Sequence, residues 1–321
     1  MKRFVVMGLW AVMALGLAAG YPRFESAVLE ASQQLAQLEL EWRSAEQRAR
    51  VLADDPYAAP QERDEAEDAL ERARLRWAEQ RLALRQEAYR LWTDVLKGQA
   101  QVDVALAALK VAGIRLEAAR IRSAKGAASQ VELDSAERAH EQASLQLAQA
   151  RSALTGAKEA LASRASAQPD DVPDIQPPED LNVEGHSKLE LARLDVRAAE
   201  RALAAAEGPD TARVERERRE AALRAARERG ARLRGQLERR LESLKAQYTR
   251  QRRLAELARD AVADAEKKMA AEQLRFDKGL ASKLALETAR QALVQARADE
   301  LAARVELGRL ALELWAFAEA P

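Results

Sequence analysis

The sequence carries one short motif twice, at a fixed separation of 153 positions. Residues 122–129 read RSAKGAAS and residues 275–282 read RFDKGLAS, so Arg, Lys, Gly and Ser recur in the same places. Strong helix formers surround both copies, whereas the Gly–x–x–Ser part is poorly suited to a helix interior. An internal duplication of this kind predicts a fold of two similar halves, each broken at its copy of the motif.

Proline positions show where long helices can run. The prolines leave two long spans without proline, 61–168 and 210–320. Since an interior proline costs a helix about 3 kcal/mol, these spans can hold the long helices. Residues 62–124 predict a helix of about 95 Å and residues 130–165 one of about 54 Å, with arms of similar length in the second span. Shorter helices are expected at residues 24–53 and 187–207.

Apolar residues after each motif alternate in steps of three and four, as in a coiled-coil seam. His140 interrupts the first seam and Glu300 the second. The many alanines allow helix axes to approach closely, which favours helices packed side by side. The two seams are Leu133, Ala136, His140, Ala143, Leu147, Ala150, Leu154, Ala157 and Leu161, and Leu286, Ala289, Leu293, Ala296, Glu300, Ala303, Leu307, Leu310, Leu314 and Phe317.

Composition supports this arrangement. Hydrophobic residues make up 48% of the chain but aromatic residues only 4%, so thin Ala/Leu seams are favoured over a thick core. The prediction is an all-α fold of two tandem repeats of long antiparallel coiled-coil helical hairpins. The first repeat is assigned to residues 21–165 and the second to residues 187–321, with a Pro- and Asp-rich linker at 166–186 that is partly extended.

The first twenty residues have a different character. Lys2 and Arg3 precede an apolar run of 16 residues, 4–19, and small residues precede Tyr21. This pattern predicts a cleaved signal peptide over residues 1–20. An uncleaved membrane anchor is the alternative, although the run is shorter than the roughly 20 residues that span a bilayer. The sequence has no cysteine, so it offers neither a lipoprotein attachment site nor a disulfide.

The two motifs also suggest chemistry. Gly126 and Gly279 can supply the backbone of a helix reversal, and Ser129 and Ser282 can cap the returning helices, with Glu132 completing a capping box. Arginine and lysine beside both glycines favour the helix dipole by about 0.3–1 kcal/mol. We interpret the rest of this recurrence as partner docking, with an apolar contact between the charges. The candidate docking residues are Arg122, Lys125, Gly126, Ser129, Arg275, Lys278, Gly279, Leu280, Ala281 and Ser282.

No enzymatic arrangement is indicated. With two histidines and no cysteine, a His/Cys metal site and a Ser–His nucleophile are disfavoured, so we expect no catalytic residue, metal or cofactor. Lysine and arginine total 52, as do aspartate and glutamate, so no net charge points to nucleic acid. Two local charge runs stand out: residues 54–71 are acidic and residues 213–240 are rich in arginine. They are either solvated helix starts or complementary surfaces around a ring.

The duplicated motif with its heptads resembles the TolC-like outer-membrane efflux proteins. The best instance is RFDKGLAS followed by LETARQALVQARADELAARVELGRLALELW, and PDIQPPEDLNVEGHSK resembles the family's crossing between repeats. The resemblance implies a trimeric helical tube that docks by its reversals onto a periplasmic adaptor (membrane fusion) protein and passes substrates outward. Members of that family also have strand hairpins between short and long helices, where this chain has only DDPYAAPQ and EGPD. We therefore expect no transmembrane β-barrel.

A further departure concerns the family's pore constriction. Rings of aspartate often lie just inside the second reversal, where this chain has Ala285 and Thr288, so that gate is not expected. The leading expectation is a non-enzymatic periplasmic conduit or docking component of an efflux or type I secretion assembly. It would be a homo-oligomer in the cell envelope, peripheral to the outer membrane, without an integral span after signal cleavage. The alternatives are a barrel-less coiled-coil spacer or scaffold, and a chaperone that clasps clients between helical arms.

Overall fold

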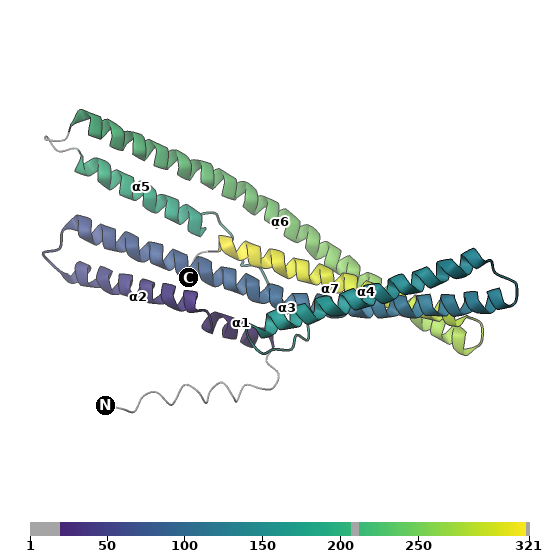
Figure 1. The fold of residues 1–321 in the computed structure, drawn as a ribbon. Helices are drawn as coiled ribbons and strands as arrows, with labels where there is room; N and C mark the ends of the chain where they lie inside the picture. The colour runs from purple at the N-terminus through teal and green to yellow at the C-terminus, as the bar shows by residue number, and fades with distance from the viewer. Residues whose placement is uncertain (1–19, 207–211, 319–321) are drawn as a thin grey trace, which may run out of the picture. The chain divides into compact units, whose positions relative to one another are not determined.

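The computed structural model describes residues 20–206 and 212–318; the predicted signal segment and the EGPD turn lie largely outside these ranges. The described ranges contain seven α-helices and a short 3-10 helix, and no strand (Figure 1). The all-α prediction is therefore confirmed. The elements are α1 (Tyr21–Glu30), α2 (Gln33–Asp54), α3 (Pro60–Ala124), α4 (Gln130–Ala162), α5 (Ser187–Ala205), α6 (Arg213–Asp277), α7 (Lys283–Leu314) and η1 (Trp315–Phe317).

The sequence duplication is also a duplication of structure. Helices α3 and α6 have 65 residues each, and Arg213 begins α6 153 positions after Pro60 begins α3. Helices α4 and α7 begin at Gln130 and Lys283, again 153 positions apart. Each long helix is followed by a reversal and a returning helix, which confirms the two predicted hairpins. The offset does not extend to α1, because its counterpart falls within residues 163–186, which form neither helix nor strand.

The single short helix expected at residues 24–53 was wrong: two helices, α1 and α2, occupy this segment. Ser32 separates them, with backbone angles of φ −79° and ψ 105°. Its hydroxyl oxygen accepts a hydrogen bond from the Leu35 N–H at 3.2 Å and thereby caps α2. Serine side chains compete with the helix for backbone groups in this way, so the break has a local cause. The second short helix, α5, ends at Ala205, close to the predicted end.

The described residues form two compact units, and each unit draws segments from both hairpins. The first comprises residues 20–27, 88–174 and 250–308, and includes both reversals. The second comprises residues 28–87, 175–206, 212–249 and 309–318. The helices α3, α6 and α7 contribute to both units, so the long helices are shared between them.

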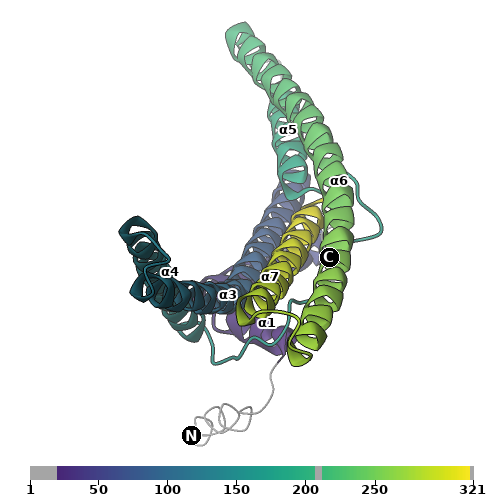
Figure 2. The ribbon, with the colours of Figure 1, turned by 90° about the vertical axis from the view of Figure 1, so that its right-hand side faces the viewer.

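Contacts within the first unit place its helices in the order α4, α3, α7, α6 (Figure 2). The Tyr89 hydroxyl of α3 donates to the Val305 carbonyl of α7 at 3.0 Å, and Gln251 of α6 donates to the Ala303 carbonyl at 3.1 Å. The contact of α3 with α7 is close, because a Cβ at Gly308 would collide with the Tyr89 hydroxyl. The lack of a side chain at Gly308 thus allows this close side-by-side packing.

The second unit has a distinct apolar core where α5, α6 and the end of α7 meet. Its buried residues are Val183, Leu189, Leu237, Leu241, Leu244, Leu310, Leu314 and Phe317. The Asn182 N–H donates to the Phe317 carbonyl at 3.1 Å, and the ring of His186 lies 4.8 Å from that of Phe317. The start of α5 and the end of α7 therefore meet in the second repeat.

Two tryptophans anchor the linker by hydrogen bonds to its backbone. In the first unit, Trp92 Nε1 donates to the Asp171 carbonyl at 2.9 Å, and Arg304 forms an ion pair with the Asp171 carboxylate at 3.0 Å. The hydrogen bond from Arg304 holds the Asp171 pKa below its usual value. In the second unit, Trp315 Nε1 donates to the Gln176 carbonyl at 3.1 Å. These contacts explain how a segment without secondary structure is held in place.

Members of both charge runs form ion pairs within the second unit. Asp68, near the acidic start of α3, forms an ion pair with Arg201 of α5, and Arg72 pairs with Asp195 at 3.0 Å. Several arginines at the start of α6 pair with glutamates of their own helix, as Arg219 does with Glu215 at 2.7 Å. None of the helices in residues 20–206 and 212–318 combines the length and the apolar character needed to cross a bilayer.

Candidate docking sites at the helix reversals

Both reversals close with the same backbone geometry. At the first, the Ala127 N–H donates to the Arg122 carbonyl at 2.8 Å and the Gly126 N–H to the Ser123 carbonyl at 2.9 Å. At the second, Leu280 donates to Arg275 and Gly279 to Phe276 at the same two distances. This pair of bonds is the Schellman motif, whose glycine adopts a left-handed conformation. Gly126 has φ 70° and Gly279 has φ 71°, which confirms the predicted reversals.

Serine caps the returning helix in each hairpin. The Ser129 hydroxyl accepts from the Glu132 N–H at 3.2 Å, and the Ser282 hydroxyl from the Ala285 N–H at 3.1 Å. The predicted capping box is thus half formed, since the described hydrogen bonds include none from the Ser129 N–H to the Glu132 carboxylate. In both α4 and α7 the serine accepts a hydrogen bond from an N–H of the first turn that has no partner within the helix. The two reversals therefore share their shape.

The four predicted cations do not share one environment. Arg275 forms an ion pair with Glu272 on its own helix at 2.7 Å. Arg122, Lys125 and Lys278 are exposed and have no ion pair among the described residues. Arg122 and Arg275 take part in the Schellman motif through their backbone carbonyls, so the motif does not involve their side chains. Arg122 and both lysines therefore carry charge that no described carboxylate pairs, whereas the charge of Arg275 is paired.

Apolar side chains are exposed beside these charges. Leu280 is 69% exposed at the second reversal, and Ala281 is half-buried. The structure adds Ile121 and Leu274, which are exposed at equivalent positions of the two hairpins, one residue before the arginines. The prediction missed this pair, although the 153-residue offset applied to apolar positions would have found it. Each reversal therefore presents positive charge next to apolar surface.

A polar contact joins the two arms of each hairpin at equivalent positions. In the first hairpin, Arg120 pairs with Glu137 at 3.1 Å. In the second, Arg290 donates to the Gln273 side chain at 2.8 Å. The positions correspond, but the arginine has moved from the outgoing helix to the returning one. Both contacts hold the arms together near the reversal and so support its position.

A buried carboxylate lies just inside the second reversal. Glu287 of α7 is 7% exposed and contacts Lys110 of α3 and Arg290, at 2.8 Å in both cases. Burial raises the Glu287 pKa, but the hydrogen bond from Lys110 and the charge of Arg290 outweigh it and hold the pKa below 4.5. This contact joins the two repeats. By contrast, the Ala285 N–H donates to the Ser282 hydroxyl, and the Thr288 hydroxyl donates to the Leu284 carbonyl.

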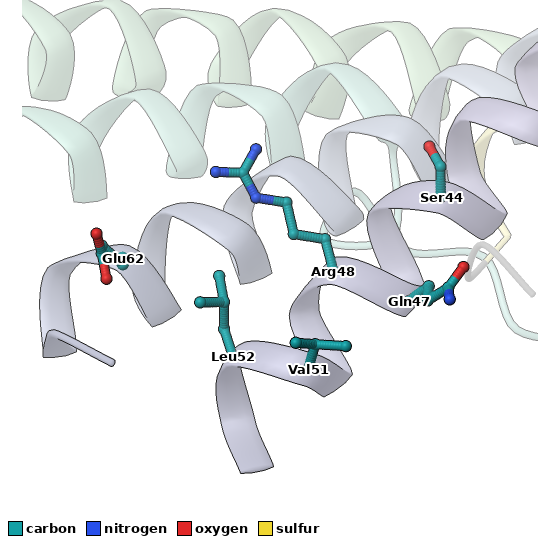
Figure 3. Close-up of a pocket in the computed structure, with 6 residues that line it drawn as sticks. All are labelled: Ser44, Gln47, Arg48, Val51, Leu52 and Glu62. Carbon is teal, nitrogen blue, oxygen red and sulfur yellow. The ribbon is translucent and has the colours of Figure 1, made fainter. Parts of the chain in front are cut away.

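A shallow hollow of about 450 Å³ lies at the other end of the first repeat, between α2 and α3 (Figure 3). Ser44, Gln47, Arg48, Val51 and Leu52 of α2 and Glu62 of α3 line it. Figure 3 shows the Arg48 side chain extending from α2 toward α3, with the Ser44 hydroxyl and the Glu62 carboxylate well apart. Across the described ranges, no group of three or more histidine, aspartate or glutamate side chains is placed to bind a metal ion.

Comparison with known proteins gives a clear answer for the fold alone. Neither models of protein families nor curated proteins match the sequence. Among solved structures, the outer membrane protein VceC of Vibrio cholerae matches with a TM-score of 0.62 and 14% identity, over 92% of this chain and 94% of VceC.

Two further structures match in the same way. A membrane protein from Pseudomonas aeruginosa matches with a TM-score of 0.63 and 14% identity, over 93% of this chain and 90% of that one. The CmeC outer membrane channel of Campylobacter jejuni gives 0.61 and 10%, over 94% and 86%. At such low identity the likeness concerns the fold, and the resemblance noted in the sequence is confirmed at that level. The chain has the helical fold of the TolC-like outer-membrane channels.

Proposed function

We propose that this chain is a periplasmic conduit or docking component of an efflux or type I secretion assembly in the cell envelope. It acts without catalysis, as a homo-oligomer whose reversals bind a periplasmic adaptor (membrane fusion) protein. The observation that carries the proposal is that each reversal exposes a lysine at the equivalent position, Lys125 or Lys278, and apolar side chains at equivalent positions. The fold shared with VceC and the CmeC channel supports a role in envelope transport.

The composition of the reversals fits binding rather than folding alone. Gly126 and Gly279 are explained by their left-handed backbone, and Ser129 and Ser282 by capping. Folding has no comparable need for the exposed side chain of Leu280. An exposed apolar group beside two or three cations suits a partner with an apolar groove and an acidic rim.

The outer helices of the first unit support self-association. Helices α4 and α6 end the series α4, α3, α7, α6, so each has a face without a helix of this series beside it. Leu145 is exposed on α4, and Leu254 and Leu257 are exposed on α6. Apolar side chains on two outer helices can cover one another when copies of the chain pack side by side. The family resemblance implies three copies.

The 65-residue helices α3 and α6 also favour a second function, a coiled-coil spacer of the envelope. A spacer requires length but requires neither docking at the reversals nor a closed oligomer. The two functions therefore differ in what the reversals do, and one experiment separates them.

The test is the combined variant Lys125→Gln, Lys278→Gln and Leu280→Ser. We expect helicity and oligomer mass to stay unchanged, by circular dichroism and sedimentation. Association with the adaptor of the same cell should weaken about tenfold or more, because charged and apolar contacts are lost together. Cells that express this variant in place of the wild-type protein should accumulate more dye than cells with the wild type.

The matched control carries the same chemical changes away from the reversals: Lys158→Gln, Lys268→Gln and Leu40→Ser, all at exposed positions. This variant should transport normally. Full transport by the reversal variant would contradict docking and favour the spacer. A loss of transport that unfolding explains would also count against docking.

A further inference from the structure

The second unit contains a larger hollow, of about 850 Å³, that the proposed transport function does not use. It lies between α3, α6, the start of α5 and the end of α7 with η1. Leu82, Leu233, Leu237 and Phe317 are apolar residues of its lining, to which Trp77 and Trp315 also belong. Five elements of one unit thus line a space large enough for a small molecule.

The lining of this hollow is positively charged. Arg81, Arg85, Lys188 and Arg240 contribute to it, against Glu79 and Glu313. Arg240 and Glu313 approach each other at 3.8 Å, so this pair is already partly neutralised. Arg81 and Lys188, in contrast, have no ion pair within the described ranges. Because the lining has more cationic than anionic side chains, it favours an anionic ligand. Glu79 and Glu313 would repel an anion that carries several negative charges.

A buried donor in the same lining also lacks an acceptor. The indole Nε1 of Trp77 is buried and has no hydrogen-bond partner among the described residues. Buried donors in folded proteins almost always have one. An oxygen of a ligand seated beside Trp77 could accept this hydrogen bond after a small shift of the ring.

The tryptophan faces limit the shape of the ligand. The Arg81 guanidinium lies 5.2 Å from the centre of the Trp77 ring, and Trp42 packs on that ring at 5.1 Å. The Arg85 guanidinium lies 5.3 Å from the Trp315 ring centre. These contacts occupy the positions where an aromatic ligand would stack. The leucines and Phe317 instead suit a flexible alkyl chain.

We propose that this hollow binds an amphipathic monoanion, an alkyl chain that ends in a carboxylate. The alkyl chain contacts the leucines and Phe317 of the lining, and the carboxylate meets Arg81 and Lys188, with the Trp77 N–H as a further donor. Binding here is independent of the docking role of the reversals, because all lining residues belong to the second unit.

The probe is decanoate, titrated into the full chain and followed by calorimetry and tryptophan fluorescence. Decanol and decyltrimethylammonium carry an alkyl chain of similar length with a neutral or positive head. We expect saturable binding of decanoate, about tenfold tighter than that of either comparator, as for a charge-assisted contact. Equal binding of all three amphiphiles, or no saturable binding, would overturn the proposal without reference to any variant.

Charge variants locate the site. Arg81→Gln with Lys188→Gln should weaken decanoate binding about tenfold. The control, Arg218→Gln with Arg229→Gln, removes the same charge from two exposed arginines of α6 that are also without an ion pair in the described chain. It should bind decanoate like the wild type. Equal weakening in both variants would show a general charge effect, and thermal melting of each variant checks its fold.

Discussion

Gly279 is a residue whose contribution can be isolated, because no atom lies within 4 Å of a Cβ built there. Gly279→Ala therefore tests the left-handed backbone alone, and should lower the free energy of unfolding by about 1 kcal/mol. Gly230 is the matched control: it also has open space around it but lies inside α6. Gly230→Ala should raise stability by about 0.5–1 kcal/mol, since glycine is unfavourable in a helix. Both are measured by thermal or urea unfolding. Effects of the same sign would contradict this account.

Glu287 is the residue that ties the two repeats together near the second reversal. Glu287→Gln removes the charge that Lys110 and Arg290 contact, and should cost about 1 kcal/mol at pH 7, because both cations remain partly exposed to water. Its folded pKa is lowered, so its stabilisation is present above pH 4.5 and is lost as the pH falls through the folded pKa.

The difference between Glu287→Gln and the wild type should accordingly shrink in acid, as urea unfolding at several pH values can show. Asp134 is the control, because it occupies the corresponding position of α4 and is exposed. Asp134→Asn should change stability little at any of these pH values. A constant difference for Glu287→Gln at every pH would argue against a charge contact.

At the scale of the element, α5 begins with an unusual cap. The His186 Nδ1 accepts a hydrogen bond from the Lys188 N–H at 3.2 Å, while its ring packs on Phe317. Burial, with the charges of Lys188 and Arg240, lowers the His186 pKa below 6.5. Glu313 of α7 also lines this region and pairs with Arg240. A protonated imidazole could not accept the capping bond, so α5 needs this histidine neutral.

The expected result is a stability that is complete above pH 6.5 and falls as the pH drops from there through the lowered folded pKa. His186→Asn keeps a capping oxygen and should remove this part of the pH dependence. His186→Ala should cost about 0.5–2 kcal/mol at pH 7, where the cap is intact in the wild type. Thermal unfolding between pH 5 and 8 measures both. An unchanged pH profile in His186→Asn would rule out this histidine as the cause.

At the scale of the whole molecule, self-association can be tested on the outer face of α6. Leu254 and Leu257 are exposed there, and we expect another copy of the chain to cover them. Changing both to lysine should lower the sedimentation mass to that of a monomer, because charge would be buried against apolar surface. Leu280→Lys at the second reversal is the control and should leave the oligomer intact. An unchanged mass for the α6 variant would place the contact elsewhere.

Much of this protein could be predicted from the sequence alone, because the relevant forces act between residues close in the chain. Helix propensity and proline positions determined α3 and α6, and heptad spacing determined the seams of α4 and α7. The conformational freedom of glycine and the capping ability of serine determined both reversals, which lie where the duplication predicts them. The break at Ser32 has an equally local cause but a weak signal, and the prediction missed it.

The tertiary structure alone decided what depends on faces of helices that meet across more than a hundred residues. In the sequence, Glu287 is one of many charged residues on a helix. Only the packing of α7 against α3 buries it beside Lys110. Asp68 in the acidic start of α3 pairs with Arg201 of α5, and not with an arginine of the run in α6. The cationic hollow exists only because five elements meet around it. Burial and charge pairing belong to such juxtapositions, and helical periodicity states which face is apolar but not which helix covers it.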